Sequence, residues 1–232
     1  MFRQVAASSL VMGMPLVAEP SSAQSLEPPR NSGAIQVGLR LGYGVPFGQF
    51  GQASPDEFNG FSGEVSRFIA GQIPIGLDAG YLITPHVYVG LLFQYGFGLA
   101  GSTTKSSCGP PGVSCLLRDT TLGVGAQFHL IPSASFDPWV GVGGGYEWFD
   151  FIIPEGDRTT WSVSGFQYLN LQLGGDVRLT SNFAAGPFVS FSAGQYATVK
   201  LTTESTATGD VVNKAFHEWL LFGVRGVYNI RL

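Results

Sequence analysis

The end of the chain alternates regularly enough between apolar and other side chains to predict a β-strand. Over residues 222–232, one face would carry Phe222, Val224, Tyr228, Ile230 and Leu232, and the other mostly glycine, arginine and asparagine. A helix would repeat every 3.6 residues instead of every two. A bare apolar face opposite a face that carries the charges is typical of a sheet that separates two media.

The same alternation recurs along most of the chain and predicts eight strands, the second of them interrupted near Gly71. We expect them at residues 34–45, 61–83, 87–99, 117–130, 138–149, 161–179, 183–201 and 216–232. No stretch shows a helical period with capping residues. The 33 glycines among 232 residues also argue against long helices, because each glycine inside a helix is unfavourable.

The connections between these strands alternate in length, which predicts their arrangement. Those at residues 84–86, 131–137 and 180–182 are short. Those at residues 46–60, 100–115, 150–160 and 202–215 are longer and mostly polar. Short turns on one rim and long loops on the other are typical of an up-and-down antiparallel barrel inserted in one direction. The first strand would then pair with the last.

Two kinds of barrel fit eight alternating strands, and they differ in which face is apolar. A soluble, lipocalin-like binding barrel has its apolar side chains inside, whereas a membrane barrel has them outside. Only 12% of the residues are charged, too few for an outer wall in water, which favours the membrane barrel. Aromatic residues near both ends of the predicted strands would form two interfacial girdles. Those near the short turns are Tyr81, Phe128, Trp139, Phe183 and Tyr228, and those near the long loops are Tyr43, Phe97, Trp148, Trp161 and Tyr196.

The N-terminus has the features of a secretory signal peptide. Arg3 precedes an apolar stretch at residues 5–17, and Ser21-Ser22-Ala23 resembles a cleavage site. We therefore expect a signal peptide at residues 1–23, a short periplasmic lead-in at 24–32 and a barrel at 33–232. In an exported protein, the close pair Cys108 and Cys115 favours a disulfide, and no further metal ligands lie near it. The net charge of −4 gives no basic footprint for nucleic acid.

Together, the signal peptide, the eight strands, the unequal rims and the alternating last strand resemble the small eight-stranded outer-membrane β-barrel proteins, such as the OmpA membrane domain, OmpX and OmpW. The resemblance covers residues 33–232. It implies a location in the bacterial outer membrane, contact with its lipid, and recognition by the barrel-assembly machinery during biogenesis. Such proteins often end in Phe, whereas this chain ends in Leu232.

The face predicted to point inward carries scattered polar and charged side chains. An eight-stranded barrel is just wide enough for side chains to fill it, so these groups are expected to form a hydrogen-bonded polar plug. The alternative is a narrow pore or a small-molecule conduit, left open by the inward glycines. The predicted inward groups are Arg40, Asp78, Gln94, Gln127, His129, Glu147, Asn170, Asp176, Arg178, Arg225 and Arg231.

Neither an enzyme nor a cofactor site is expected from the sequence. The histidines are His86, His129 and His217, and nothing in the sequence supplies the third group that a nucleophile and its base require. A lipid-modifying hydrolase using His129 and Ser133 is therefore a minor alternative. The loops at 46–60 and 108–115 suggest recognition of an extracellular partner, because loops on a rigid scaffold often bind. A structural or surface-interaction role is our main expectation.

Two places depart from the alternation. Trp219 and Leu221 fall on the inward face while Glu218 falls outward, which indicates either a β-bulge or a segment beyond the bilayer. Phe166 and Tyr168 also have inward parity. Both pairs are expected to cap or fill the lumen.

Overall fold

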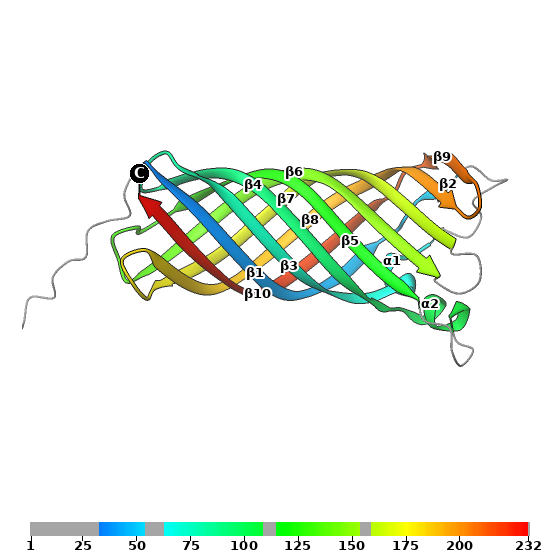
Figure 1. Ribbon diagram of the computed structural model, residues 1–232, viewed down its shortest axis with the longest axis horizontal. Helices are drawn as coiled ribbons and strands as arrows, with labels where there is room; N and C mark the ends of the chain where they lie inside the picture. Colours follow the sequence, from blue (N-terminus) through cyan, green and yellow to red (C-terminus); the bar gives the residue numbers. More distant parts are fainter. Residues whose placement is uncertain (1–32, 54–62, 109–114, 154–158, 232) are drawn as a thin grey trace, which may run out of the picture.

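Strand β1 pairs with strand β10 along its whole length, and this pairing closes the sheet into a barrel (Figure 1). The computed structural model describes residues 33–53, 63–108, 115–153 and 159–231. Within those ranges the wall consists of eight antiparallel strands in the order β10-β1-β3-β4-β5-β6-β7-β8, with β8 paired to β10. Their bounds are β1 Ala34–Gly48, β3 Ile69–Leu82, β4 Val87–Ala100, β5 Leu116–His129, β6 Phe136–Ile153, β7 Thr159–Arg178, β8 Phe183–Thr202 and β10 Phe216–Arg231. The predicted eight-stranded up-and-down barrel is confirmed.

The two ends of the barrel differ as the loop lengths predict. At the end we call the short-turn end, β3, β5 and β7 connect tightly to the strands that follow them. At the long-loop end lie the strands β2 (Gln52–Ala53) and β9 (Thr206–Asn213) and the helices α1 (Val65–Phe68) and α2 (Ser102–Ser107) (Figure 1). These four elements were not predicted. The two helices and β2 are too short to show a period, and β9 is largely exposed on both faces and shows no alternation. Among the described residues, no helix is long and apolar enough to cross a membrane.

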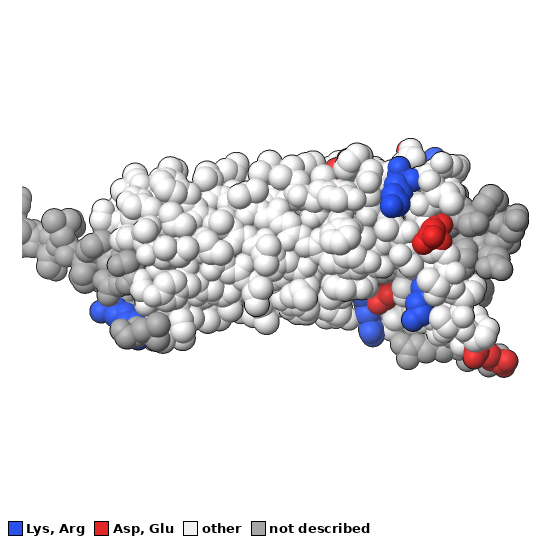
Figure 2. Space-filling model, turned by 90° about the horizontal axis from the view of Figure 1, so that it is seen from above, with Lys and Arg blue, Asp and Glu red and all other residues white. Residues whose placement is uncertain are grey.

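The outside of the wall is a continuous apolar surface, which we call the belt. Large apolar side chains that point outward from different strands are 55–61% exposed, for example Leu39, Leu91, Val124, Leu173 and Val224. Figure 2 shows a broad band without charged side chains, and blue and red atoms towards the ends. On β10 the belt runs between Glu218 and Arg231, which at the usual rise and tilt of a barrel strand is roughly 30 Å of height. This height suits the hydrocarbon core of a bilayer, so the wall has the polarity of a membrane barrel and not that of a soluble one.

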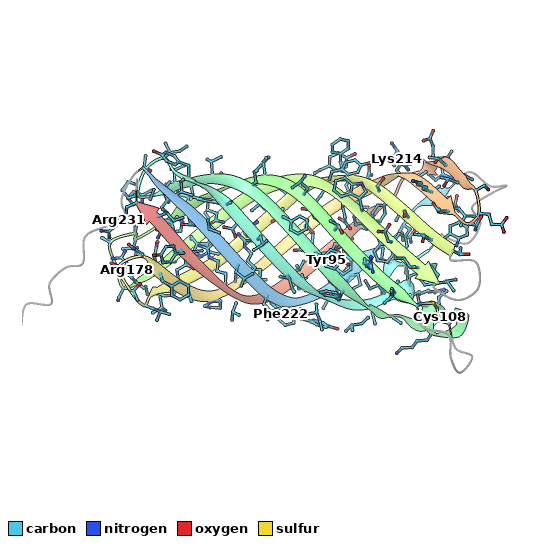
Figure 3. The ribbon with its side chains drawn as sticks, in the orientation of Figure 1. Tyr95, Cys108, Arg178, Lys214, Phe222 and Arg231 are labelled. Atoms are coloured by element: carbon cyan, nitrogen blue, oxygen red, sulfur yellow. A yellow bond between two sulfur atoms is a disulfide. The ribbon has the colours of Figure 1, made fainter. Side chains whose placement is uncertain are left out.

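Most of the predicted girdle residues lie on the outer surface. Tyr81, Phe128, Phe183 and Tyr228 are exposed near the short-turn end, as are Phe97 and Trp148 near the long-loop end. Tyr43 packs against Phe222, which Figure 3 shows on the outside of the wall.

Three predicted girdle residues lie inside instead. Trp161 packs against the buried apolar cluster at the long-loop end, and the other two point into the lumen. Trp139 is 1% exposed and Tyr196 is fully buried. Trp139 lies directly opposite Gly174 on β7, and a Cβ atom at Gly174 would collide with its ring. The missing side chain makes room for the indole inside the lumen, so its assignment to a girdle was wrong.

The two irregularities have different explanations. The pairing of β10 with β1 and β8 runs without any shift through Trp219 and Leu221, so there is no bulge, and both side chains are buried inside. In β7, register shifts flank Gln167 and move Phe166 and Tyr168 to the outer face, where they are 57% and 59% exposed. The expectation that these two rings fill the lumen was wrong, because a bulge reverses the parity of the residues beside it.

Candidate functional site

The lumen is closed in its short-turn half by a network centred on Arg225 of β10. Its guanidinium forms two hydrogen bonds to the Asp176 carboxylate, at 2.9 and 2.7 Å, and donates a third to Gln127 Oε1 at 2.8 Å. The group also lies 3.7 Å from the ring centroid of Trp139, whose indole N–H donates to Asp176 at 3.2 Å. The side chains of Arg225 and Asp176 are both 0% exposed. This bidentate, stacked geometry compensates the desolvation of both charges.

A second ion pair lies beside the first. Arg40 donates to Asp78 Oδ1 at 2.9 Å and to Gln172 Oε1 at 2.9 Å. Tyr88, on the neighbouring strand β4, donates to the other Asp78 oxygen at 3.4 Å. Its ring occupies the space left by glycines of β3 and β4, Gly80 and Gly90, where a Cβ atom would collide with it. We call the two ion pairs together, with Gln127, Gln172, Tyr88 and Trp139, the plug.

A carboxylate near the long-loop end organises a second polar cluster. Glu147 accepts hydrogen bonds from Tyr196 Oη at 2.7 Å and Trp219 Nε1 at 3.2 Å, and its other oxygen lies 3.1 Å from His217 Nε2. The rings of Tyr196 and His217 stack with centroids 3.9 Å apart. Side chains from three strands, β6, β8 and β10, thus meet at one buried carboxylate, which fixes the position of each ring around it.

An apolar cluster, which we call the cap, surrounds these groups and fills the barrel at the long-loop end. It lies inside the wall and includes side chains from the loop after β1 and from helix α1. Its buried members are Phe50, Val65, Ile69, Leu117, Phe149, Phe151, Val163, Tyr196, Val199, Val211, Trp219 and Leu221. The cap therefore closes the long-loop half of the lumen by hydrophobic packing, whereas the plug closes the other half by ion pairing.

Between plug and cap lies a small central cavity with a volume of about 50 Å³ open to water-sized molecules. Arg40 lines it on the plug side and Leu221 on the cap side, with Gln94, Thr121 and Ser192 among the polar groups between them. At roughly 10–15 Å³ per probe-sized site, it has room for a few water molecules and not for a continuous channel.

Of the predicted lumen residues, nine lie inside: Arg40, Asp78, Gln94, Gln127, His129, Glu147, Asn170, Asp176 and Arg225. Arg178 lies at the short-turn rim, where it donates to the carbonyl oxygen of Pro132. Arg231 is exposed at the same end, so its place in the lumen network was wrong; it lies at the last described position of β10, beyond the belt (Figure 3). The sequence prediction of the lumen set missed Gln172, Tyr88, Tyr196 and His217, although the alternation along each strand places these residues on its inner face. The expectation that Trp219 fills the lumen is in line with its burial.

The histidines are held by other groups. His129 Nδ1 lies 2.9 Å from Asp137 Oδ2 inside the short-turn end, and His86 Nδ1 lies 2.7 Å from the His129 carbonyl oxygen. His129 and His217 are 0% and 1% exposed, which leaves neither ring open to a substrate.

At the long-loop end, Cys108 and Cys115 form a disulfide whose Cα atoms are 6.0 Å apart, directly after α2. Most of the loop that it closes lies outside the described residues, as do the expected signal peptide and lead-in. Within the described ranges, no group of three or more His, Cys, Asp or Glu side chains is arranged to hold a metal ion.

Known proteins resemble this chain in fold and not in sequence. No protein-family model matches the sequence, and no curated protein matches it. The structure is similar to that of the outer-membrane protein OprG from Pseudomonas aeruginosa, with a TM-score of 0.51 and 14% identity over 88% of this chain and 100% of that one. It is also similar to the outer-membrane protein AlkL, with a TM-score of 0.52 and 13% identity over 95% of this chain and 98% of that one.

The chain therefore has the fold of a small integral outer-membrane β-barrel protein. Its belt requires a lipid environment, and the bacterial outer-membrane location predicted from the sequence agrees with this fold. The fold defines this class but leaves the specific role open, since one fold hosts many functions.

Proposed function

We propose that the protein is a closed outer-membrane barrel that acts through its long-loop end, in a structural or surface-interaction role, and does not conduct solutes. The observation that carries this proposal is the Arg225–Asp176 ion pair, which lies across the lumen with both side chains 0% exposed. Opening a path there would leave buried charges without partners, at a cost of several kcal/mol.

The cap supports the same conclusion from the other end. Its aromatic members include Phe50, which packs against Phe149 and Tyr196 at centroid distances of 5.5 Å. The central cavity is confined between this cluster and the plug, so it does not favour the alternative of a narrow pore. We also propose that the protein is not an enzyme, because its two buried histidines are each held by a carboxylate and covered.

The long-loop end is the surface available for a partner outside the cell. Strand β9 extends the sheet beyond β8, and exposed apolar side chains there include Val212 and Phe216. We further propose that the barrel-assembly machinery recognises the last strand, whose Tyr228 and Ile230 alternate on the outer face.

Single-channel recording in planar bilayers tests the closed lumen. The refolded protein is first shown to be inserted, because a folded barrel migrates faster than its boiled form on a denaturing gel. We expect no conductance steps from wild-type protein or from Arg231→Ala. Reproducible steps from the folded wild type would contradict a closed barrel and favour the pore.

A further inference from the structure

One buried carboxylate in the lumen has no counter-charge. Asp119 of β5 points inward and is 1% exposed. The Gln72 amide and the Glu147 carboxylate lie close to its carboxylate, but neither completes a well-formed hydrogen bond with it. Burying a carboxylate without a partner is strongly unfavourable, and a native structure normally compensates it. Asp119 therefore indicates that something beyond the described protein atoms satisfies it.

Other unpartnered oxygens lie around this carboxylate. Gln72 of β3 is 0% exposed, and both atoms of its amide lack partners. Gln72 and Asp119 approach one another across Gly96 of β4: a Cβ atom there would collide with Gln72 Oε1 and lie 3.4 Å from Asp119 Cβ. The hydroxyl of Thr121, two residues along β5 on the same inner face, is also buried without a partner.

A second carboxylate completes the group. Glu147 is directly opposite Thr121 in the pairing of β5 with β6, which makes Asp119 its diagonal neighbour on the inner face. Its two oxygens accept from three donors, so one lone pair of four is uncommitted. Asp119 offers two oxygens, Glu147 offers the one with the uncommitted lone pair, and Gln72 and Thr121 offer one each. Carboxylate, amide and hydroxyl oxygens are the donors that hard cations prefer.

We propose that Asp119, Glu147, Gln72 and Thr121 bind a divalent cation of the calcium or magnesium type inside the barrel. Two carboxylates balance the charge of one such ion. Thr121 also lines the central cavity, whose water-sized space supplies the remaining ligands of an ion that binds six or more oxygens. Because the cap covers the site, the ion enters while the barrel folds.

A proton shared by the two carboxylates is the competing explanation. One proton would satisfy a single pair of oxygens and leave Gln72 Oε1 and Thr121 Oγ1 unpartnered. A cation with its bound waters would instead coordinate the oxygens of Asp119, Glu147, Gln72 and Thr121 together. Because the cation accounts for all four side chains and the proton for only two, we favour the cation. The site is independent of the proposed surface role, since a closed barrel can hold or lack the ion.

Terbium(III), which replaces calcium at oxygen sites and emits when a nearby indole is excited, tests this site. The full mature chain is refolded into detergent micelles with terbium alone. We expect emission excited through Trp219, because its indole N–H contacts Glu147. Calcium present during refolding should compete with terbium, and Asp119→Asn should weaken binding by roughly tenfold or more. Asp210→Asn removes an exposed carboxylate at the long-loop end and is the matched control, which should bind as wild type does.

Thermal unfolding gives a second measurement that does not depend on emission. Calcium present during refolding should raise the unfolding temperature of wild type and not that of Asp119→Asn, whereas in a chelator Asp119→Asn should be at least as stable as wild type. Trp219→Phe should lose most of the emission and keep the calcium-induced shift. The proposal is overturned if wild type neither emits nor responds to calcium, if Asp119→Asn behaves like wild type, or if the emission survives in Trp219→Phe.

Discussion

The belt and the long-loop end are built from the same strands, yet they have opposite polarity. In the belt, β6 points Val140 and Val142 outward, and its inward Trp139 contacts the Arg225–Asp176 ion pair. Beyond Trp148 the same strand points Phe149 inward, fully buried, and Asp150 outward. The two-residue period continues unchanged, and only the surroundings differ: lipid outside the belt, water outside the end.

This reversal explains the segment that seemed irregular in the sequence. Trp219 and Leu221 follow the inward parity of β10 without a bulge, and Glu218 follows the outward parity. At this height the barrel resembles a soluble one, with an apolar interior. The membrane boundary of a strand is therefore the residue at which the apolar side chains change from the outer face to the inner face. On the belt side of this boundary the interior should be stabilised by ion pairs, and on the long-loop side by hydrophobic packing.

The largest effect should follow from breaking the plug. Arg225→Met leaves Asp176 buried without its partner, and we expect a loss of roughly 3–5 kcal/mol in the free energy of unfolding. Urea titration of the refolded barrel in micelles measures it. Arg231→Met, at the exposed end of the same strand, should change it by less than about 0.5 kcal/mol. Equal effects of the two substitutions would mean that the plug contributes nothing to stability.

Removing a ring from the cap should have the next largest effect. Phe149 is fully buried, and Phe149→Ala leaves a cavity that neither lipid nor water fills, at a cost of about 3 kcal/mol. Phe191 is 39% exposed on the belt, where lipid replaces a missing ring, so Phe191→Ala should cost less. The same urea titration compares them. A larger loss for Phe191→Ala would show that the long-loop end is not a packed core.

A charge on the outer surface should distinguish the two regions directly. Val224 is 59% exposed in the belt, and Val224→Arg should cost roughly 2–4 kcal/mol if it lies near the bilayer midplane. Thr208→Arg, on exposed β9 beyond the belt, should cost less than about 0.5 kcal/mol. Both are measured by unfolding in lipid vesicles, since micelles adapt to a charge more easily. Tolerance of Val224→Arg would contradict a lipid-facing wall.

The wall could be predicted from the sequence because its information is local. The alternation of side chains within each strand predicts that strand and its outer face, and the length of each connection predicts the rim on which it lies. The eight strands can therefore be predicted without knowing which residues are in contact. The short helices do not follow, since they have too few residues to show a period. Strand β9 does not follow because both of its faces are largely exposed and its side chains do not alternate. The bulges in β7 were missed because a one-residue insertion is invisible until the neighbouring strand fixes the register.

The lumen was only partly predictable, because its partners are distant in both sequence and sheet. Arg225 of β10 contacts Asp176 of β7 and Gln127 of β5, and parity alone places these three inside without showing that they meet. Trp139 was misplaced by its position near a strand end. The residue that shows where the Trp139 ring points is Gly174, which lies opposite Trp139 on the neighbouring strand. That neighbour is known only once the strand pairing is known.

The smallest effect should come from the disulfide, and it tests whether the loop elements unfold together with the barrel. Cys108 and Cys115 are seven residues apart, and for so short a loop the chain-entropy model gives about 2–3 kcal/mol if the loop unfolds with the wall. The main contacts of helix α2 are with β3, β4 and the short helix α1, so we expect it to open locally without unfolding the strands. Cys108→Ser with Cys115→Ser should then change the barrel's urea midpoint hardly at all. It should, however, make the loop more sensitive to protease. If the free energy of unfolding of the strands instead falls by the full 2–3 kcal/mol, the loop elements and the belt unfold as one cooperative unit. The two regions would then differ in polarity and not in stability.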